Sequence, residues 1–203
     1  MQQLSFFEGP RPQKRLPEDL LYYLPGLFTP AESELLMNVL IETSPWQQHV
    51  QRLYDKEVKT PRLTSWYGDT HLHPELLAKI PEMLPWTPEL TMIRKKVEPL
   101  IGEPCNCVLL NYYRDGNDSV AWHSDRESTP GKKTIVGSVS FGQVRSFDIR
   151  NKYDHAEKYS IRLEHGSFLL MKAGFQDAWE HRVAKSSRPM KGRLNLTFRT
   201  IGG

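Results

Sequence analysis

The spacing of hydrophobic residues divides the chain into a helical first half and a strand-rich second half. Thr29 and Pro30 precede a run of leucines and valines at helical spacing, and Glu32 completes a capping box with Thr29 as N-cap. This pattern predicts a helix over residues 30–43. A second helix is predicted to begin at Pro88, with an apolar face made by Leu90, Ile93, Val97 and Ile101.

After Gly102 the pattern changes to short runs of Val, Ile, Phe and Tyr separated by turn residues, such as Asp115–Asp118 and Pro130-Gly131. About eight short strands in about 100 residues are typical of a double-sheet jelly roll. The expected fold class is α+β, a double-stranded β-helix with N-terminal helices packed on one face. The predicted strands span residues 105–113, 119–124, 134–141, 144–150, 158–163, 167–172, 179–183 and 193–200.

The length of 203 residues suits one domain with three parts. Residues 1–15 are polar and proline-containing, and we expect an N-terminal arm. Residues 16–102 hold the predicted helices and an aromatic, charged segment that ends near Asp69. Residues 103–203 form the strand-rich core of the same domain.

The composition is that of a globular protein, with 38% hydrophobic and 25% charged residues. No run approaches the roughly 18 apolar residues of a membrane span, and the N-terminus lacks an apolar signal core. We therefore expect a cytoplasmic protein with no membrane partner, in which Cys105 and Cys107 are reduced thiols. The net charge of +3 does not by itself predict a nucleic-acid binder, although clustered basic residues would allow one.

Three tripeptides of the form His-x-acid could each supply two ligands of the 2-His-1-carboxylate triad that holds non-haem Fe(II). They are His73-Pro74-Glu75, His123-Ser124-Asp125 and His155-Ala156-Glu157. Only the second lies in the strand-rich half beside an apolar strand end, where alternate residues share a face. The third ligand would be His165 or His181. His165 lies in a turn-like context and His181 in a strand-like one, and the spacing leaves both open.

The predicted last strand alternates polar and apolar residues, so its polar side chains share one face. This face is either an exposed sheet surface or a binding site. A guanidinium neutralises a carboxylate bidentately, as the dianion 2-oxoglutarate requires. Asn111 and Tyr113 form a second mixed face before the metal motif. The polar face of the last strand carries Arg193, Asn195, Thr197 and Arg199.

The order and spacing of these motifs resemble the AlkB family, whose members are Fe(II)- and 2-oxoglutarate-dependent dioxygenases that dealkylate nucleic acids. The resemblance runs from about Pro61 to Ile201 and is strongest to the animal homologues that repair DNA and RNA. It rests on the segments Asn111–Tyr113, Trp122–Glu127, Ser138–Gly142, His165–Ser167, His181–Val183 and Arg193–Arg199.

The resemblance implies Fe(II), 2-oxoglutarate and dioxygen as cofactor and co-substrates. It implies that His123, Asp125 and His181 hold the iron and form the catalytic centre. It further implies that 2-oxoglutarate binds through five residues, two of them near the metal-chelating end. At the distal carboxylate these are Arg193, Tyr113 and Asn195, and at the chelating end Asn111 and Arg199.

The resemblance also implies the reaction: demethylation of 1-methyladenine and 3-methylcytosine in DNA, and in RNA as a further substrate, with release of formaldehyde. The base would leave the stack to reach the metal, and residues 16–102 would include the nucleotide-recognition region. Trp66 or Tyr67 would stack on the base, Glu127 would face its positive charge, and Arg62 belongs to a Pro-Arg signature of the relatives.

Residues 50–56 are predicted to form a hairpin, either an ordinary one or one that extrudes the base with Leu53 and Tyr54. We expect a monomer. The alternatives are an AlkB-like oxygenase acting on a protein or small molecule, and a non-catalytic binding module, which the intact site residues disfavour. Basic residues could contact phosphates or be solvated charges: Lys132, Lys133, Arg145, Arg150, Lys152, Arg182, Lys185, Arg188 and Lys191.

Overall fold

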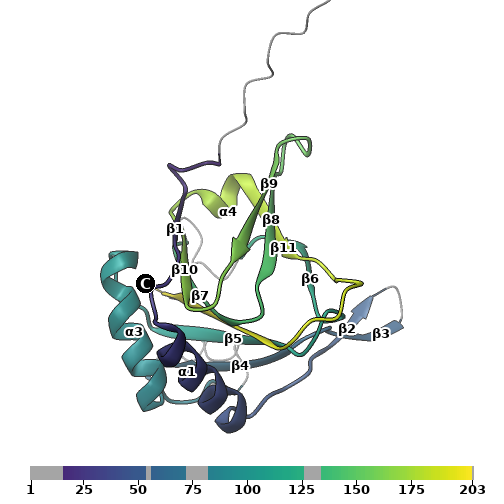
Figure 1. Ribbon diagram of the computed structural model, residues 1–203. Helices are drawn as coiled ribbons and strands as arrows, with labels where there is room; N and C mark the ends of the chain where they lie inside the picture. The colour runs from purple at the N-terminus through teal and green to yellow at the C-terminus, as the bar shows by residue number, and fades with distance from the viewer. Residues whose placement is uncertain (1–15, 54–55, 72–81, 126–133, 203) are drawn as a thin grey trace, which may run out of the picture.

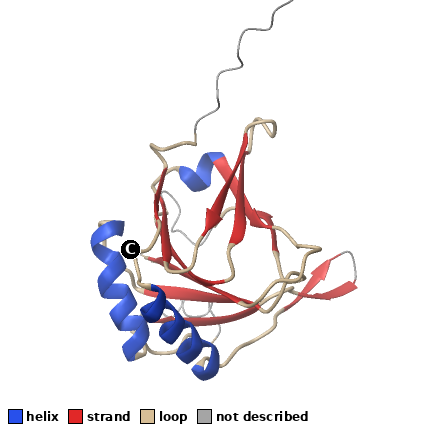
Figure 2. Ribbon diagram, in the orientation of Figure 1, coloured by secondary structure: helices blue, strands red, loops and turns tan. Residues whose placement is uncertain are grey.

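The computed structural model describes residues 16–53, 56–71, 82–125 and 134–202. These residues form two facing β-sheets, with two helices along the outer side of the larger sheet and a hairpin projecting beyond it (Figures 1 and 2). Within these residues, no helix is both long and apolar enough to cross a membrane. Several predictions concern positions outside the described residues: the arm 1–15, Tyr54, His73–Glu75, Glu127, Pro130-Gly131, Lys132 and Lys133.

Both predicted helices are confirmed. Helix α1 spans Pro30–Thr43, and the capping box is present: the Thr29 hydroxyl accepts from the Glu32 amide at 3.2 Å, and the Glu32 carboxylate accepts from the Thr29 amide at 2.8 Å. Helix α3 spans Pro88–Ile101 and ends at Gly102, whose φ of +84° is the left-handed conformation that glycine adopts without strain. Both helices contact strand β7 of the larger sheet.

The larger sheet has six antiparallel strands, and it includes two that the sequence pattern did not predict. These are the two edge strands, of four and six residues, contributed by the N-terminal half of the chain. Strand β1 has only four residues, too few to show a two-residue period, and the burial of side chains along the six residues of β4 does not alternate. In order across the sheet the strands are β1 (Leu21–Leu24), β10 (Ser167–Met171), β7 (Val136–Gly142), β12 (Arg193–Arg199), β5 (Cys107–Tyr113) and β4 (Leu63–Gly68).

The smaller sheet has four antiparallel strands and faces the larger one (Figure 2). All eight strands predicted after Gly102 are present, and their ends differ by at most two residues from the prediction. A separate hairpin and a short helix complete the fold. The strands of the smaller sheet are, in order, β6 (Val120–His123), β11 (Trp179–Val183), β8 (Arg145–Asn151) and β9 (Lys158–Leu163). The hairpin is β2 (Val50–Leu53) and β3 (Lys56–Lys59), and the helix is α4 (Phe175–Ala178).

Strand β12 lies in the middle of the molecule, and all seven of its residues are buried. Its apolar residues pack in the cluster between the larger sheet and the helices, which includes Leu194, Leu196 and Phe198. Its polar residues therefore face the space between the two sheets. The interpretation of this polar face as an exposed sheet surface is wrong, because the smaller sheet covers it.

Candidate active site

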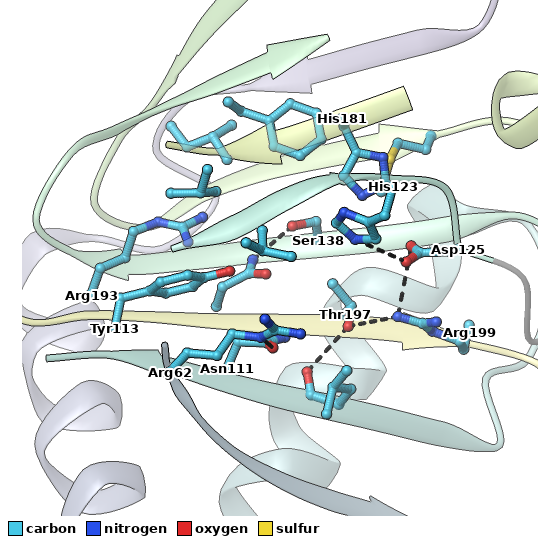
Figure 3. Close-up of a pocket in the computed structure, with 17 residues that line it drawn as sticks. Arg62, Asn111, Tyr113, His123, Asp125, Ser138, His181, Arg193, Thr197 and Arg199 are labelled. Atoms are coloured by element: carbon cyan, nitrogen blue, oxygen red, sulfur yellow. Dashed lines mark hydrogen bonds and ion pairs between the residues drawn. The ribbon is translucent and has the colours of Figure 1, made fainter. Parts of the chain in front are cut away.

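Two histidines and an aspartate meet at one end of the space between the sheets (Figure 3). His123 ends β6, and Asp125 follows two residues later. His181 lies on β11 directly opposite His123 in the antiparallel register, and the centres of the two imidazole rings are 4.2 Å apart. One ligand atom from each of the three residues lies within 4.8 Å of the others. The pairing of β6 with β11 thus brings the two histidines together, and Asp125 joins them from the segment that follows β6. These are the three residues named from the resemblance.

His165 is elsewhere, in the turn that joins β9 to β10. Its Nδ1 accepts a hydrogen bond from the Gly142 amide at 2.7 Å, so it holds two turns together. His155 is exposed at the tip of the β8–β9 hairpin. Among the described residues, His123, Asp125 and His181 are the only group able to bind a metal through three such ligands.

The backbone fixes which nitrogen of His123 is available for a metal. Nδ1 lies 2.9 Å from the Ala121 carbonyl, which can only accept, so Nδ1 carries the proton. Nε2 then has a lone pair available for a metal, and this nitrogen lies 3.7 Å from Asp125 Oδ1. A ring nitrogen held in this way by a backbone carbonyl is the usual outer support of a metal-binding histidine.

Burial and charge determine the protonation of the other two ligands. Burial alone would raise the pKa of Asp125, but the charges of Arg199 and of both histidines outweigh it and hold this pKa below its ordinary value. Burial lowers the pKa of His181 to about 4, against the opposing effect of Asp125. At neutral pH the cluster therefore presents a carboxylate and a neutral imidazole, which are the forms that bind a metal.

A metal ion fits this cluster. Asp125 Oδ2 and His181 Nδ1 are buried and have no hydrogen-bond partner in the part of the chain that the structure describes. Buried polar atoms without a partner are rare in proteins and indicate that something else binds there. Two imidazoles and one carboxylate are the donor set of non-haem Fe(II) sites, in which the other coordination positions stay open.

A buried cavity of about 120 Å³ runs from this cluster between the sheets. Arg193 and Tyr113 lie at the end of the cavity away from the histidines (Figure 3). Besides these, the walls are made by the polar face of β12, residues of β5 and β7 and apolar residues of the smaller sheet. They include Asn111, Ser138, Phe147, Asn195, Thr197 and Arg199.

Arg193 is a buried cation with unused donors. It is 1% exposed, and Nη2 donates to Ser140 Oγ at 2.9 Å. Nε and Nη1 have no hydrogen-bond partner among the residues that the structure describes. Burial lowers its pKa to about 10, which still leaves it charged at pH 7. Its guanidinium lies 5.2 Å from the centre of the Tyr113 ring. These properties fit the carboxylate of a small anion.

The side chains between Arg193 and the metal cluster form hydrogen bonds with one another. The Asn195 amide donates to Ser138 Oγ at 2.8 Å and to a β7 carbonyl, and Asn111 Oδ1 accepts from Arg62 Nε at 2.9 Å. Arg199 Nη2 lies 3.8 Å from Asp125 Oδ2, beside the metal cluster. The five residues predicted for 2-oxoglutarate thus surround one cavity, with Arg193 and Arg199 toward opposite ends (Figure 3).

A larger and more open cavity of about 600 Å³ adjoins the metal cluster. It lies between the hairpin strand β3, the start of β6 and the end of β11. Four residues line both cavities: Arg62, Val120, His123 and Val183. The larger cavity is lined by several basic side chains, which are Lys59, Arg62, Arg182 and Lys185.

The two aromatic candidates for stacking on a base are placed on opposite faces of β4. Trp66 pairs with Leu109, on the cavity face of β5, and its ring centre lies 5.7 Å from the Arg199 guanidinium. Tyr67 is buried in the cluster between the larger sheet and the helices. Tyr67 therefore faces away from the metal cluster. Trp66 lies on the cavity side of β4, where it packs beside Cys107 and Ile201 and lines neither of the two cavities described above.

Arg145 is not available to a phosphate, so the interpretation of this residue as a phosphate contact is wrong. It is 3% exposed and donates to the backbone carbonyls of Asp115, Asp118 and Ala184. Arg150 and Arg182 lie on the outer face of the smaller sheet, 4.3 Å and 4.5 Å from the ring centre of Trp122. Each also pairs with a carboxylate, so these two arginines are not isolated charges.

Three residues of the site, Ser138, Ser140 and Gln176, were not predicted from the sequence. The two serines alternate with apolar residues along β7, and this alternation marks a strand with one polar face. Ser140 bonds Arg193, and Ser138 bonds Asn195. Gln176 lies in a four-residue helix that has no periodic pattern, and it accepts a hydrogen bond from the Asp125 amide. No sequence signal indicated this contact.

Comparison with known proteins shows that residues 20–199 match the 2OG-Fe(II) oxygenase superfamily. The chain is 35% identical over 185 residues to alpha-ketoglutarate-dependent dioxygenase alkB homolog 3 of Rattus norvegicus, covering 87% of this chain and 62% of that protein. It is 35% identical over 159 residues to DNA oxidative demethylase ALKBH2 of Homo sapiens, covering 74% and 60%. The chain thus spans less than two thirds of the length of these relatives.

Among solved structures, one described as the structure of OsALKBH1 superposes with a TM-score of 0.62. The superposition covers 89% of this chain and 97% of that one, at 20% sequence identity. At this identity the likeness concerns the fold alone, and it agrees with the predicted double-stranded β-helix.

Proposed function

The chain belongs to the 2OG-Fe(II) oxygenase superfamily, and from that premise we propose that it is an AlkB-family dioxygenase that demethylates alkylated bases of nucleic acid. The substrates would be 1-methyladenine and 3-methylcytosine in DNA, with RNA as a second substrate. The names of two relatives, a DNA oxidative demethylase among them, support a nucleic-acid substrate. In the same proposal, the protein acts as a monomer in the cytoplasm.

The observation that carries this proposal is the basic cavity of about 600 Å³ beside the metal cluster. It shares His123 and Arg62 with the buried co-substrate cavity, so a group bound in it would lie beside the residues that would hold the metal. Lysine and arginine side chains at its wall suit a polyanion more than a neutral metabolite. The hairpin β2–β3 borders the same cavity through Val58 and Lys59, which supports a role for the hairpin in holding the substrate strand.

In this proposal His123, Asp125 and His181 hold Fe(II), and the ion with 2-oxoglutarate supplies the oxidation of an N-linked methyl group by dioxygen. The products are succinate, carbon dioxide, formaldehyde and the unmodified base, which accounts for both oxygen atoms. Arg193 holds the distal carboxylate, with Tyr113 and Asn195 beside it, and Asn111 and Arg199 lie near the chelating end.

The other side chains orient the substrate and exclude water. Apolar residues of the smaller sheet, such as Phe147 and Val183, line the buried cavity and keep it dry. Arg62, bonded to Asn111, lies where the two cavities meet and would contact the base or its sugar. Trp66 would support the base from the side of β4. A role for Glu127 facing the positive base stays a prediction, since this residue lies outside the described part of the chain.

The test is demethylation of oligonucleotides that carry one 1-methyladenine or 3-methylcytosine, as single and double strands of DNA and RNA, with Fe(II) and 2-oxoglutarate. Restored base and formaldehyde are both measured. The activity should disappear in His181→Ala and persist in His155→Ala, a matched change in an exposed histidine of another His-x-acid tripeptide. Consumption of 2-oxoglutarate without repair of any oligonucleotide would overturn the proposal and point to a protein or small-molecule substrate.

A further inference from the structure

Strand β6, which carries the ligand His123 and leads to Asp125, is poorly fixed by the sheet alone. β6 has four residues, lies at the edge of the smaller sheet and pairs only with β11 in the described structure. The register of that pairing shifts between His181 and Val183. Asp125 follows the end of β6 and has no strand partner there. Its position must therefore be set by something other than sheet hydrogen bonds.

Two hydrogen bonds attach this segment to the start of β11 and to helix α4. Ser124 Oγ donates to the Trp179 carbonyl at 2.9 Å, and the Asp125 amide donates to Gln176 Oε1 at 3.0 Å. Helix α4 runs directly into β11, which carries His181 two residues after Trp179. The two bonds thus connect the aspartate ligand to the element that presents the second histidine.

Gln176 is itself held in one orientation. Its side chain is buried, and Nε2 donates to Met171 Sδ at 3.4 Å while Oε1 accepts from Asp125. The reverse orientation would set its NH₂ group against the Asp125 amide, donor against donor. Its backbone carbonyl accepts from Lys152 Nζ at 2.6 Å, which fixes the helix turn that carries it.

We propose that Gln176 is a positioning residue for the metal: by accepting from the Asp125 amide, it holds that carboxylate where it completes the cluster with His123 and His181. Helix α4 then determines metal affinity without providing a ligand. The proposal rests on the iron site of the proposed function. Outer groups that orient metal ligands typically contribute roughly 10- to 100-fold to metal affinity or activity.

The test is calorimetric titration of the metal-free protein with Co(II) alone, a divalent ion that stays in one oxidation state in air. Gln176→Leu removes the acceptor at nearly equal volume, and it should weaken Co(II) binding about 10-fold or more. Gln176→Glu restores an acceptor oxygen at the same place and should bind Co(II) within about threefold of the wild type. Asp177→Asn, an exposed neighbour on the same helix, is the matched control and should have no effect.

Circular dichroism and melting temperature are recorded for every variant, because a general loss of structure would weaken Co(II) binding in the Gln176→Glu and Gln176→Leu proteins alike. Wild-type-like Co(II) affinity in a folded Gln176→Leu protein overturns the proposal, as does a Gln176→Glu protein no better than Gln176→Leu. If Gln176→Leu does not fold, Gln176→Asn replaces it, since its shorter amide fails to reach Asp125. If His181→Ala leaves Co(II) binding unchanged, the iron site itself is wrong, which is a separate failure.

Discussion

Arg193→Met should make the protein more stable in the absence of 2-oxoglutarate while it weakens binding of this co-substrate. Burial lowers the pKa of Arg193 from 12.5 to about 10, so the folded state disfavours the cation relative to the unfolded chain. At roughly 1.4 kcal/mol per pKa unit, the charged form destabilises the fold by about 3 kcal/mol. This penalty applies below pH 10 and fades as the pH rises from there toward 12.5.

The variant loses the hydrogen bond to Ser140, which is worth about 1 kcal/mol, so the expected net gain in free energy of unfolding is about 2 kcal/mol. Methionine fills the space with an unbranched apolar chain. Co-substrate binding changes in the opposite sense. A buried carboxylate that loses its cation costs about 3–5 kcal/mol, which corresponds to a loss of affinity between about 100-fold and several thousandfold.

Urea unfolding of the metal-free protein at pH 7 measures the free energy of unfolding. Calorimetric titration with 2-oxoglutarate in the presence of Co(II), which prevents turnover, measures the affinity for the co-substrate. Arg162→Met, an exposed arginine on β9, is the matched control and should change neither. If Arg193→Met binds 2-oxoglutarate within tenfold of the wild type, the assignment of the distal carboxylate to Arg193 is refuted.

Three further changes test the supporting structure. Burial would raise the pKa of Asp118, but three hydrogen bonds from Arg114 outweigh it and lower this pKa. Asp118→Asn should therefore lower the free energy of unfolding by about 1.5–3 kcal/mol at pH 7. Urea unfolding at pH 7 and pH 3 should show this difference shrink below pH 3.8, where the wild-type carboxylate becomes protonated. Arg145→Met leaves three backbone carbonyls without their donor and should cost about 3 kcal/mol or more, seen as a lower melting temperature; an unchanged melting temperature would contradict a structural role. Thr29→Ala removes the N-cap of α1 and should cost about 1 kcal/mol, whereas a change below about 0.3 kcal/mol would show that the cap does not matter.

The strand period explains which parts of the site were predictable. Alternation along a strand predicts that His123 and Asp125 share one side and that the polar residues of the last strand share a face. The second prediction holds on β12, whereas β6 ends at His123 and Asp125 lies two residues beyond it. The same period says nothing about what covers that face. Whether Arg193 is exposed or buried depends on the smaller sheet, whose strands lie elsewhere in the sequence. The choice of His181 over His165 likewise depends on the register between β11 and β6, which spacing did not determine.

The unpredicted parts share a physical reason. Arg145 bonds carbonyls of residues 115, 118 and 184, and Gln176 bonds an amide 51 residues away, so neither contact has a local sequence pattern. Trp66 and Tyr67 are adjacent, and on a strand adjacent residues point to opposite faces. The choice between them required the pairing of β4 with β5, and β4 was not recognised as a strand.

The charges of the buried cavity explain why metal and co-substrate should strengthen one another's binding. Its described lining carries three guanidinium groups, of Arg62, Arg193 and Arg199, against the single carboxylate of Asp125. His181 adds no charge at neutral pH, because its pKa is about 4. A divalent metal alone enters a cavity that is already positive, whereas the 2-oxoglutarate dianion neutralises the excess. Low-dielectric surroundings strengthen both the repulsion that opposes the metal and the attraction that favours the dianion. Binding of the two together should therefore be more favourable than the sum of their separate binding free energies.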